Sequence, residues 1–244
     1  MSPLANILER FNRKERNLLI RDILDCPGKT PPLGDDFCGR LAKAVGISKE
    51  ALDGAWWATD FHFDWLAGAL LTFMKGESVT PRHNSSKLVM GNQEDVDLVV
   101  VAHVPTAETP HHLILIEAKA YGRFIPDQYR KKMARLERLH AFYRELEEES
   151  PHKISFHYLL YSPAKPGLDP MFLPWQSKIA TAPAHTHLTL TLPRSSILTV
   201  TRCEDKGIPD IKGAYWRCVR LPPHEDASSE VPSFPSSDAP ADGQ

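Results

Sequence analysis

Two consecutive runs of apolar residues constrain the fold of this 244-residue chain more than any other feature of its sequence. The first run, 98–104, reads Leu-Val-Val-Val-Ala-His-Val, and the second, 113–116, reads Leu-Ile-Leu-Ile. Strands with one solvent-exposed face alternate apolar and polar residues, whereas strands covered on both faces are apolar almost throughout. These runs, and a third over 154–161, therefore predict central strands of a sheet with helices packed on it.

Helical patterns flank these strands in the sequence. Apolar residues near a 3.6-residue period predict N-terminal helices over 3–25, 37–46 and 48–56. A further helix is expected to start at Thr59 or Asp60, both good N-caps, and to end near residue 75. A long helix is expected from about 127 to 149, between Pro126 and Pro151.

With a short strand expected at 87–90, the order of elements across 60–162 is α–β–β–β–α–β. This order predicts an α/β fold. We expect four regions: a helical N-terminal extension (1–58), the α/β core (59–163), a β-rich C-terminal extension packed on the core (164–221) and an acidic tail (222–244).

The tail holds five acidic residues, five Pro and five Ser but no Lys or Arg, a composition that predicts disorder. Without it the chain has 29 basic and 26 acidic residues, a net charge of +3, which permits nucleic-acid binding without requiring it. No apolar run approaches the ~18 residues that span a bilayer, and charged residues interrupt the first 21 positions. We therefore expect a cytoplasmic protein with no membrane partner.

Charged residues stand at the ends of the two apolar runs. Asp97 precedes the first run, and Glu117-Ala118-Lys119 follows the second. Residues two apart on a strand point to the same face, so Glu117 and Lys119 share one. If the two strands form an antiparallel hairpin, Asp97 lies at the same end of the sheet as these two side chains. Two carboxylates beside an ammonium group suit Mg²⁺ binding and phosphodiester hydrolysis.

Other interpretations of these residues remain open. A Glu-x-Lys pair on one strand face is also a common surface ion pair, worth at most ~1 kcal/mol. Glu94 and Asp95 compete with Asp97 for the acidic position, although only Asp97 adjoins the apolar run.

Asp97, Glu117-Ala118-Lys119 and the order of elements around them resemble the PD-(D/E)XK nuclease superfamily, which has a restriction-endonuclease-like fold. The resemblance covers about 100 residues, Asp60 to Pro163, and Val96 stands where the family's motif has Pro. The resemblance implies a restriction-endonuclease-like core with a mixed sheet.

The resemblance also implies roles for individual residues. Asp97, Glu117 and the Ala118 carbonyl would bind Mg²⁺, with Mn²⁺ as a substitute, and Lys119 would act on the attacking water. Gln128, on the following helix, would orient the site or contact phosphate. Asp64, on the preceding helix, is the best match to a further acidic residue of such families and a candidate metal ligand.

Basic residues crowd the N-terminal half of the long helix: Arg130, Lys131, Lys132 and Arg135. They are candidate nucleic-acid contacts, but a solvated face with Glu/Arg pairs explains them equally well. We expect a Mg²⁺-dependent phosphodiesterase, an endonuclease acting on DNA. The alternative is a catalytically inactive nuclease-fold module that binds nucleic acid or assembles with proteins. A homo-oligomer is left open.

Overall fold

A mixed five-stranded sheet forms the centre of the first of two structural units, Met1–Leu190 and Thr191–Gln244, into which the chain divides. The computed structural model describes residues 1–26, 28–77, 80–91, 94–120, 126–163, 186–191 and 198–220. The predicted disordered tail, 222–244, lies outside these ranges.

The strands follow the order β1-β2-β3-β4-β5 across the sheet. Their bounds are Trp56–His62 (β1), Asp95–His103 (β2), His111–Ala118 (β3), Ile154–Ser162 (β4) and Thr186–Thr189 (β5). β1, β2 and β3 are antiparallel neighbours, whereas β3, β4 and β5 run parallel. A parallel connection needs a crossover, which the long helix α5 (Pro126–Glu147) provides between β3 and β4.

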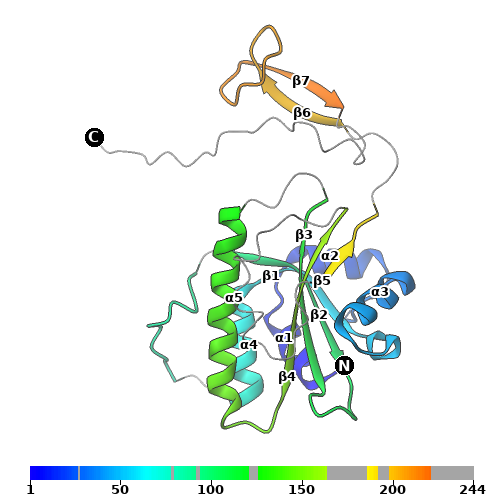
Figure 1. Ribbon diagram of the computed structural model, residues 1–244, viewed down its shortest axis with the longest axis vertical. Coiled ribbons are helices and arrows are strands. Elements are labelled where there is room, and N and C mark those ends of the chain that lie inside the picture. The colour runs from blue at the N-terminus through cyan, green and yellow to red at the C-terminus, as the bar shows by residue number, and fades with distance from the viewer. Residues whose placement is uncertain are drawn as a thin grey trace. The chain divides into compact units, whose positions relative to one another are not determined.

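Helices cover both faces of this sheet, as the apolar runs predict. Odd-numbered residues of β2 and β3, such as Val99 and Leu115, pack against α1 (Pro3–Phe11), α4 (Phe63–Lys75) and α5. Even-numbered ones, such as Val100 and Ile114, pack against α3 (Asp35–Val45) and the 3₁₀-helix Lys49–Leu52. Figure 1 shows α4 and α5 on one side of the sheet and α3 on the other. The α/β class is therefore confirmed.

The N-terminal region differs from the sequence prediction. The single helix expected over 3–25 is two helices, α1 and α2 (Glu15–Ile23), which are separated at residues 12–14. Asn17 of α2 lies against β1, where its side chain donates to the Thr59 carbonyl (3.2 Å) and accepts from the Thr59 N–H (3.3 Å). This amide satisfies the backbone N–H and C=O of Thr59, one residue of a strand that lies at the edge of the sheet.

Two element assignments were wrong. Residues 56–62, where one helix was expected to end at 56 and the next to start at Thr59 or Asp60, form β1, because this segment pairs with β2 and buries alternate side chains such as Trp56 and Ala58. Residues 87–90 form no strand: the loop is held by Asn84, whose side chain bonds both backbone groups of Val89. The order across 56–162 is therefore β–α–β–β–α–β rather than α–β–β–β–α–β.

The second unit contains an antiparallel hairpin of β6 (Leu198–Cys203) and β7 (Tyr215–Arg220). Strand β5, predicted as part of the C-terminal extension, instead pairs with β4 in the main sheet. Within the described ranges, no helix combines the length and apolarity that crossing a bilayer requires.

Candidate active site at the ends of strands β2 and β3

Asp97 and Glu117 lie at the same end of neighbouring strands. The antiparallel register pairs Leu98 with Ile116, so Asp97, which precedes Leu98, and Glu117, which follows Ile116, lie at the same end of the sheet. Glu117 faces α5, where Lys132 contacts it, and Asp97 is close enough for its charge to act on the Glu117 carboxyl. The Asp97 Oδ2 atom accepts a hydrogen bond of 2.7 Å from the Ala118 N–H, just beyond the last β2–β3 residue pair, Leu98 and Ile116. The structure therefore brings together the two acids that the sequence singles out.

Glu117 is the most deeply buried residue of this group, with 6% of its surface exposed. Burial and the nearby charge of Asp97 raise the pKa of the Glu117 carboxyl above its ordinary value. The ammonium groups of Lys132 and Lys119 oppose this rise. The site thus combines two carboxylates with two ammonium groups at one end of the sheet.

Lys119 follows the last residue of β3. Its N–H donates a hydrogen bond of 2.9 Å to the Tyr161 carbonyl, which continues the pairing of β3 with β4. Its side chain is close enough to Glu117 for its charge to act on that carboxyl. The backbone of two neighbouring strands therefore fixes the position from which the Lys119 side chain extends.

Lys132, on helix α5, contributes a contact that the sequence did not predict. We expected this residue among the nucleic-acid contacts, but its Nζ lies 2.5 Å from Glu117 Oε2. Gln128, one helical turn earlier, is exposed, and the described residues show no hydrogen bond from it to the two acids. The spacing of four residues between Gln128 and Lys132 was the sequence signal that could have identified the lysine.

Asp64 and Arg135 are tied into a structural network instead. Asp64 accepts from the Met90 and Gly91 N–H groups (3.1 and 2.8 Å) and from Arg135 Nη2 (2.6 Å). The Arg135 side chain, 4% exposed, also pairs with Glu94 at 3.0 Å. Asp64 thus anchors the 84–91 loop and the Arg135 side chain is buried, while a metal-binding role for Asp64 and a nucleic-acid contact for Arg135 stay predictions.

The competing acids are engaged as well. Asp95 pairs with Lys14 at 2.8 Å and lies against the His62 ring, while Glu94 pairs with Arg135. Asp97 is thus the acid of this segment that adjoins Glu117. The two remaining basic candidates, Arg130 and Lys131, lie exposed on α5, where Arg130 pairs with Asp127.

The strand opposite Asp97 is distorted. In the β1–β2 register Asp60 would face Asp97, but the ladder pairs only its neighbours Thr59 and Phe61. Asp60 has a φ of +51°, a left-handed conformation that costs a non-glycine residue about 1–2 kcal/mol. Its carboxylate pairs with Arg16. Backbone strain of this kind is concentrated at functional sites.

The donor set fits Mg²⁺ in its chemistry. Mg²⁺ is commonly held by one or two carboxylates with water and substrate oxygens in the other positions. Asp97 and Glu117 supply two carboxylates, whose mutual repulsion a cation would relieve. No three His, Cys, Asp or Glu side chains of the described ranges form a metal-binding group, so a closed zinc site is not supported there. The Ala118 carbonyl as a third ligand stays a prediction.

No protein-family model, curated protein or solved structure matches this chain.

Proposed function

We propose that this protein is a Mg²⁺-dependent phosphodiesterase that cleaves nucleic acid, with DNA as its substrate. The observation that carries the proposal is the convergence of Asp97, Glu117 and Lys119 at one end of the sheet, with Lys132 on Glu117. Glu117 is buried and the other three charged residues are partly buried, a costly arrangement that favours a chemical role over a purely structural one.

Each residue has a role that follows from its position. Asp97 and Glu117 would hold the cation, which supplies polarisation of the phosphodiester and a water of lowered pKa when bound. Asp97 also accepts from the Ala118 N–H, and this hydrogen bond orients its carboxylate. The Lys119 ammonium would stabilise the negative charge that develops on the phosphoryl oxygens or orient the attacking water.

The neighbouring helix offers contacts for the substrate backbone. Arg130 and Lys131 are exposed in the first turns of α5, the same part of the helix that carries Lys132. Phosphate contacts from such side chains contribute affinity without reading the base sequence. Gln128 lies on this exposed surface as well and keeps its proposed role of contacting phosphate.

One observation favours the second candidate, a nuclease-fold module without catalysis. Lys132 contacts Glu117 directly, and Asp97 is bound to the backbone, so both carboxylates have partners without a cation. A module of this kind would bind nucleic acid or protein and would not cleave.

The deciding experiment measures binding and cleavage separately. Supercoiled, linear and single-stranded DNA are incubated with the purified protein in Mg²⁺, in Mn²⁺ and in EDTA, and mobility shifts are recorded in Ca²⁺. Lys119→Ala should lower the cleavage rate by about 10²–10⁴-fold and leave DNA affinity nearly unchanged, because the lysine acts in the transition state. Lys43→Ala, an exposed lysine on α3, is the matched control.

The outcomes separate the two functions. Cleavage that depends on Mg²⁺ and on Lys119 supports the enzyme. Binding without cleavage under every metal condition would support the module. A protein that neither cuts nor binds any of the three DNA forms would refute the DNA-cleaving enzyme and the nucleic-acid-binding form of the module.

A further inference from the structure

The β6–β7 hairpin has an unusual distribution of apolar side chains. Along β6, Leu198 and Val200 are 64% and 66% exposed, whereas the alternating residues Thr199 and Thr201 are half-buried. A strand with one solvated face normally shows the reverse pattern, with apolar residues inside and polar residues outside. The outer face of this hairpin is therefore suited to contact a ligand rather than water alone.

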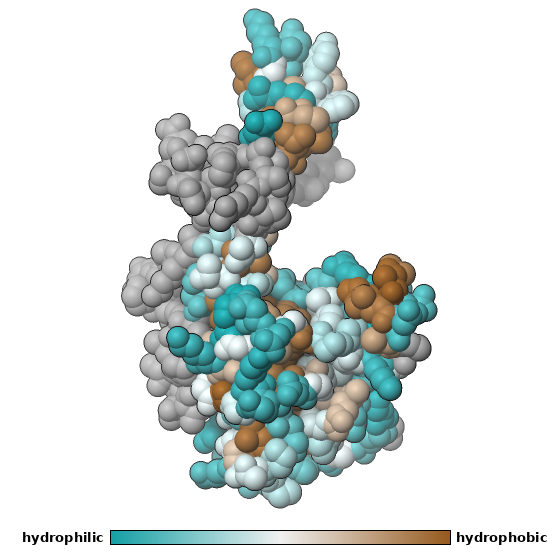
Figure 2. All heavy atoms as spheres, turned by 90° about the vertical axis from the view of Figure 1, so that its right-hand side faces the viewer, coloured by the Kyte–Doolittle hydropathy of each residue, from teal (hydrophilic) through white to brown (hydrophobic). Residues whose placement is uncertain are grey.

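The cross-strand register defines that face. Leu198 pairs with Arg220, Val200 with Cys218 and Arg202 with Trp216, so these six residues point to one side. All six are exposed, and Trp216, which has the largest side chain of the six, has 68% of its surface exposed. We call this set the outer ribbon face. Figure 2 shows apolar and hydrophilic side chains side by side on the hairpin.

The two strands are cationic. They carry Arg202, Arg217 and Arg220 and no acidic residue, while the acidic residues of the described hairpin lie in the connecting loop, 204–214. Arg202 and Arg220 lie on the outer ribbon face and Arg217 on the opposite one, so the outer face carries two positive charges and no negative one, which is complementary to a polyanion. An exposed indole beside arginine side chains is the combination that binds single-stranded nucleic acid, through stacking on the bases and attraction of the phosphates.

The connecting loop holds the ribbon in shape. Arg202 donates to the Gly213 carbonyl through Nε and Nη2 (3.0 and 2.7 Å), and the Asp210 N–H donates to the Arg202 carbonyl (3.0 Å). A Cβ at Gly213 would lie 2.2 Å from the Cys203 carbonyl oxygen, so the loop closes tightly onto β6. A pre-organised face loses less entropy when a ligand binds.

We propose that the outer ribbon face binds single-stranded nucleic acid, with Trp216 stacking on an unpaired base and Arg220 contacting phosphate. This inference rests on the proposed function for its substrate, and it names the single-stranded form as the one that the hairpin recognises. A paired base is already stacked within a duplex, so an exposed indole favours unpaired bases.

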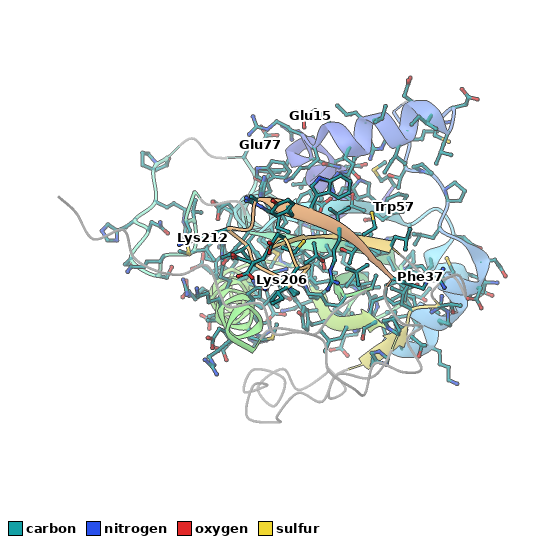
Figure 3. The ribbon with its side chains drawn as sticks, turned by 90° about the horizontal axis from the view of Figure 1, so that it is seen from above. Glu15, Phe37, Trp57, Glu77, Lys206 and Lys212 are labelled. Atoms are coloured by element: carbon teal, nitrogen blue, oxygen red, sulfur yellow. The ribbon has the colours of Figure 1, made fainter. Side chains whose placement is uncertain are left out.

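The test measures the affinity of the full-length protein for fluorescein-labelled oligothymidylate of about 16 nucleotides. Fluorescence anisotropy is recorded in EDTA, where a Mg²⁺-dependent activity does not operate. Trp216→Ala should weaken binding about tenfold, and Arg220→Gln should weaken it and reduce the slope of log affinity against log salt by about 0.7. Lys212→Ala, an exposed cation of the connecting loop labelled in Figure 3, should change neither value.

Two further measurements make the proposal falsifiable. Equal or stronger binding of the corresponding duplex would overturn the preference for single strands. Unchanged affinity of Trp216→Ala, or a fall of its melting temperature by more than a few degrees, would overturn the proposal, because the indole would then be packed against protein.

The cleavage assay keeps this proposal distinct from the proposed function. Wild-type protein that binds the oligonucleotide through Trp216 but never cleaves supports the ribbon and refutes the nuclease. Wild-type protein that cleaves with Mg²⁺ while Trp216→Ala retains full affinity supports the nuclease and refutes the ribbon.

Discussion

Replacing Lys132 by Met should destabilise the protein, because it leaves the Glu117 carboxylate beside Asp97 without its closest cation. The side chains of Glu117 and Lys132 are 8% and 20% exposed, so the pair is largely shielded from water. Removing one partner of a fully buried pair costs 3–5 kcal/mol as a general range. Lys132 is partly exposed and Lys119 still acts on Glu117, so we expect a loss of about 2–3 kcal/mol.

The assay is urea and thermal unfolding in EDTA. For a chain of this size the expected loss lowers the melting temperature by roughly 4–12 °C. Lys131→Met, at the adjacent exposed position of α5, should stay within about 0.5 kcal/mol of wild type. Adding Glu117→Gln to Lys132→Met should recover much of the loss, because the neutral amide no longer needs a cation. Mg²⁺ should stabilise Lys132→Met more than wild type, because Glu117 is then free to bind it.

A loss below about 0.5 kcal/mol for Lys132→Met, or no recovery with Glu117→Gln, would refute the idea that Lys132 balances the charge of Glu117.

Two other predictions concern stability. Burial lowers the pKa of His111 and of His157 to about 4, so below pH 6.5 the unfolded chain binds more protons than the folded one. The free energy of unfolding should therefore be highest above pH 6.5 and should fall towards pH 4, with a loss of about 2 kcal/mol per histidine at pH 5. A flat profile in urea unfolding between pH 7.5 and 5 would contradict this. Gly68→Ala should lower the free energy of unfolding by about 1–2 kcal/mol in the same assay, because the added Cβ would lie 2.8 Å from Phe11 Cε1 where α1 crosses α4. Gly39→Ala is the control: nothing lies near its added Cβ, so it should stabilise α3 by up to ~1 kcal/mol.

The core of the site was predictable from the sequence because it depends on local rules. Strand periodicity puts Glu117 and Lys119 on one face, and a short polar turn between two apolar runs indicates a hairpin that brings Asp97 beside them. The structure has this register, with Leu98 opposite Ile116. The long helix after the motif was also predicted to within a few residues, because prolines mark both of its ends.

The parts that were missed depend on contacts between distant segments. Residues 56–62 contain two good N-cap residues, Thr59 and Asp60, and local propensity favours a helix start there. They form a strand because they pair with β2, and Asn17 of α2 bonds the backbone of Thr59. No local pattern reveals an amide that reaches a strand 42 residues away. Similarly, Leu88, Val89 and Met90 are strand-like residues, but within the described ranges this segment pairs with no strand.

The basic residues of α5 show the same limit of sequence reasoning. Lys131, Lys132 and Arg135 are close in sequence and chemically alike, yet one is exposed, one neutralises a buried acid and one anchors a loop. The direction of each side chain from the helix axis decides its role, and that direction acquires meaning only once the position of α5 on the sheet is known.

The charge balance of the site bears on the choice between the two functions. Asp97 and Glu117 contribute two negative charges, and Lys119 and Lys132 contribute two positive ones, at the end of an otherwise apolar layer. Apolar side chains of similar size are generally at least as stabilising at such positions as buried ion pairs. A module that only needed a stable sheet end would therefore gain nothing from the two carboxylates, whereas a phosphodiesterase needs them to bind its metal. Lys132 does not itself separate the two functions, because it balances the charge of Glu117 whether or not a metal binds.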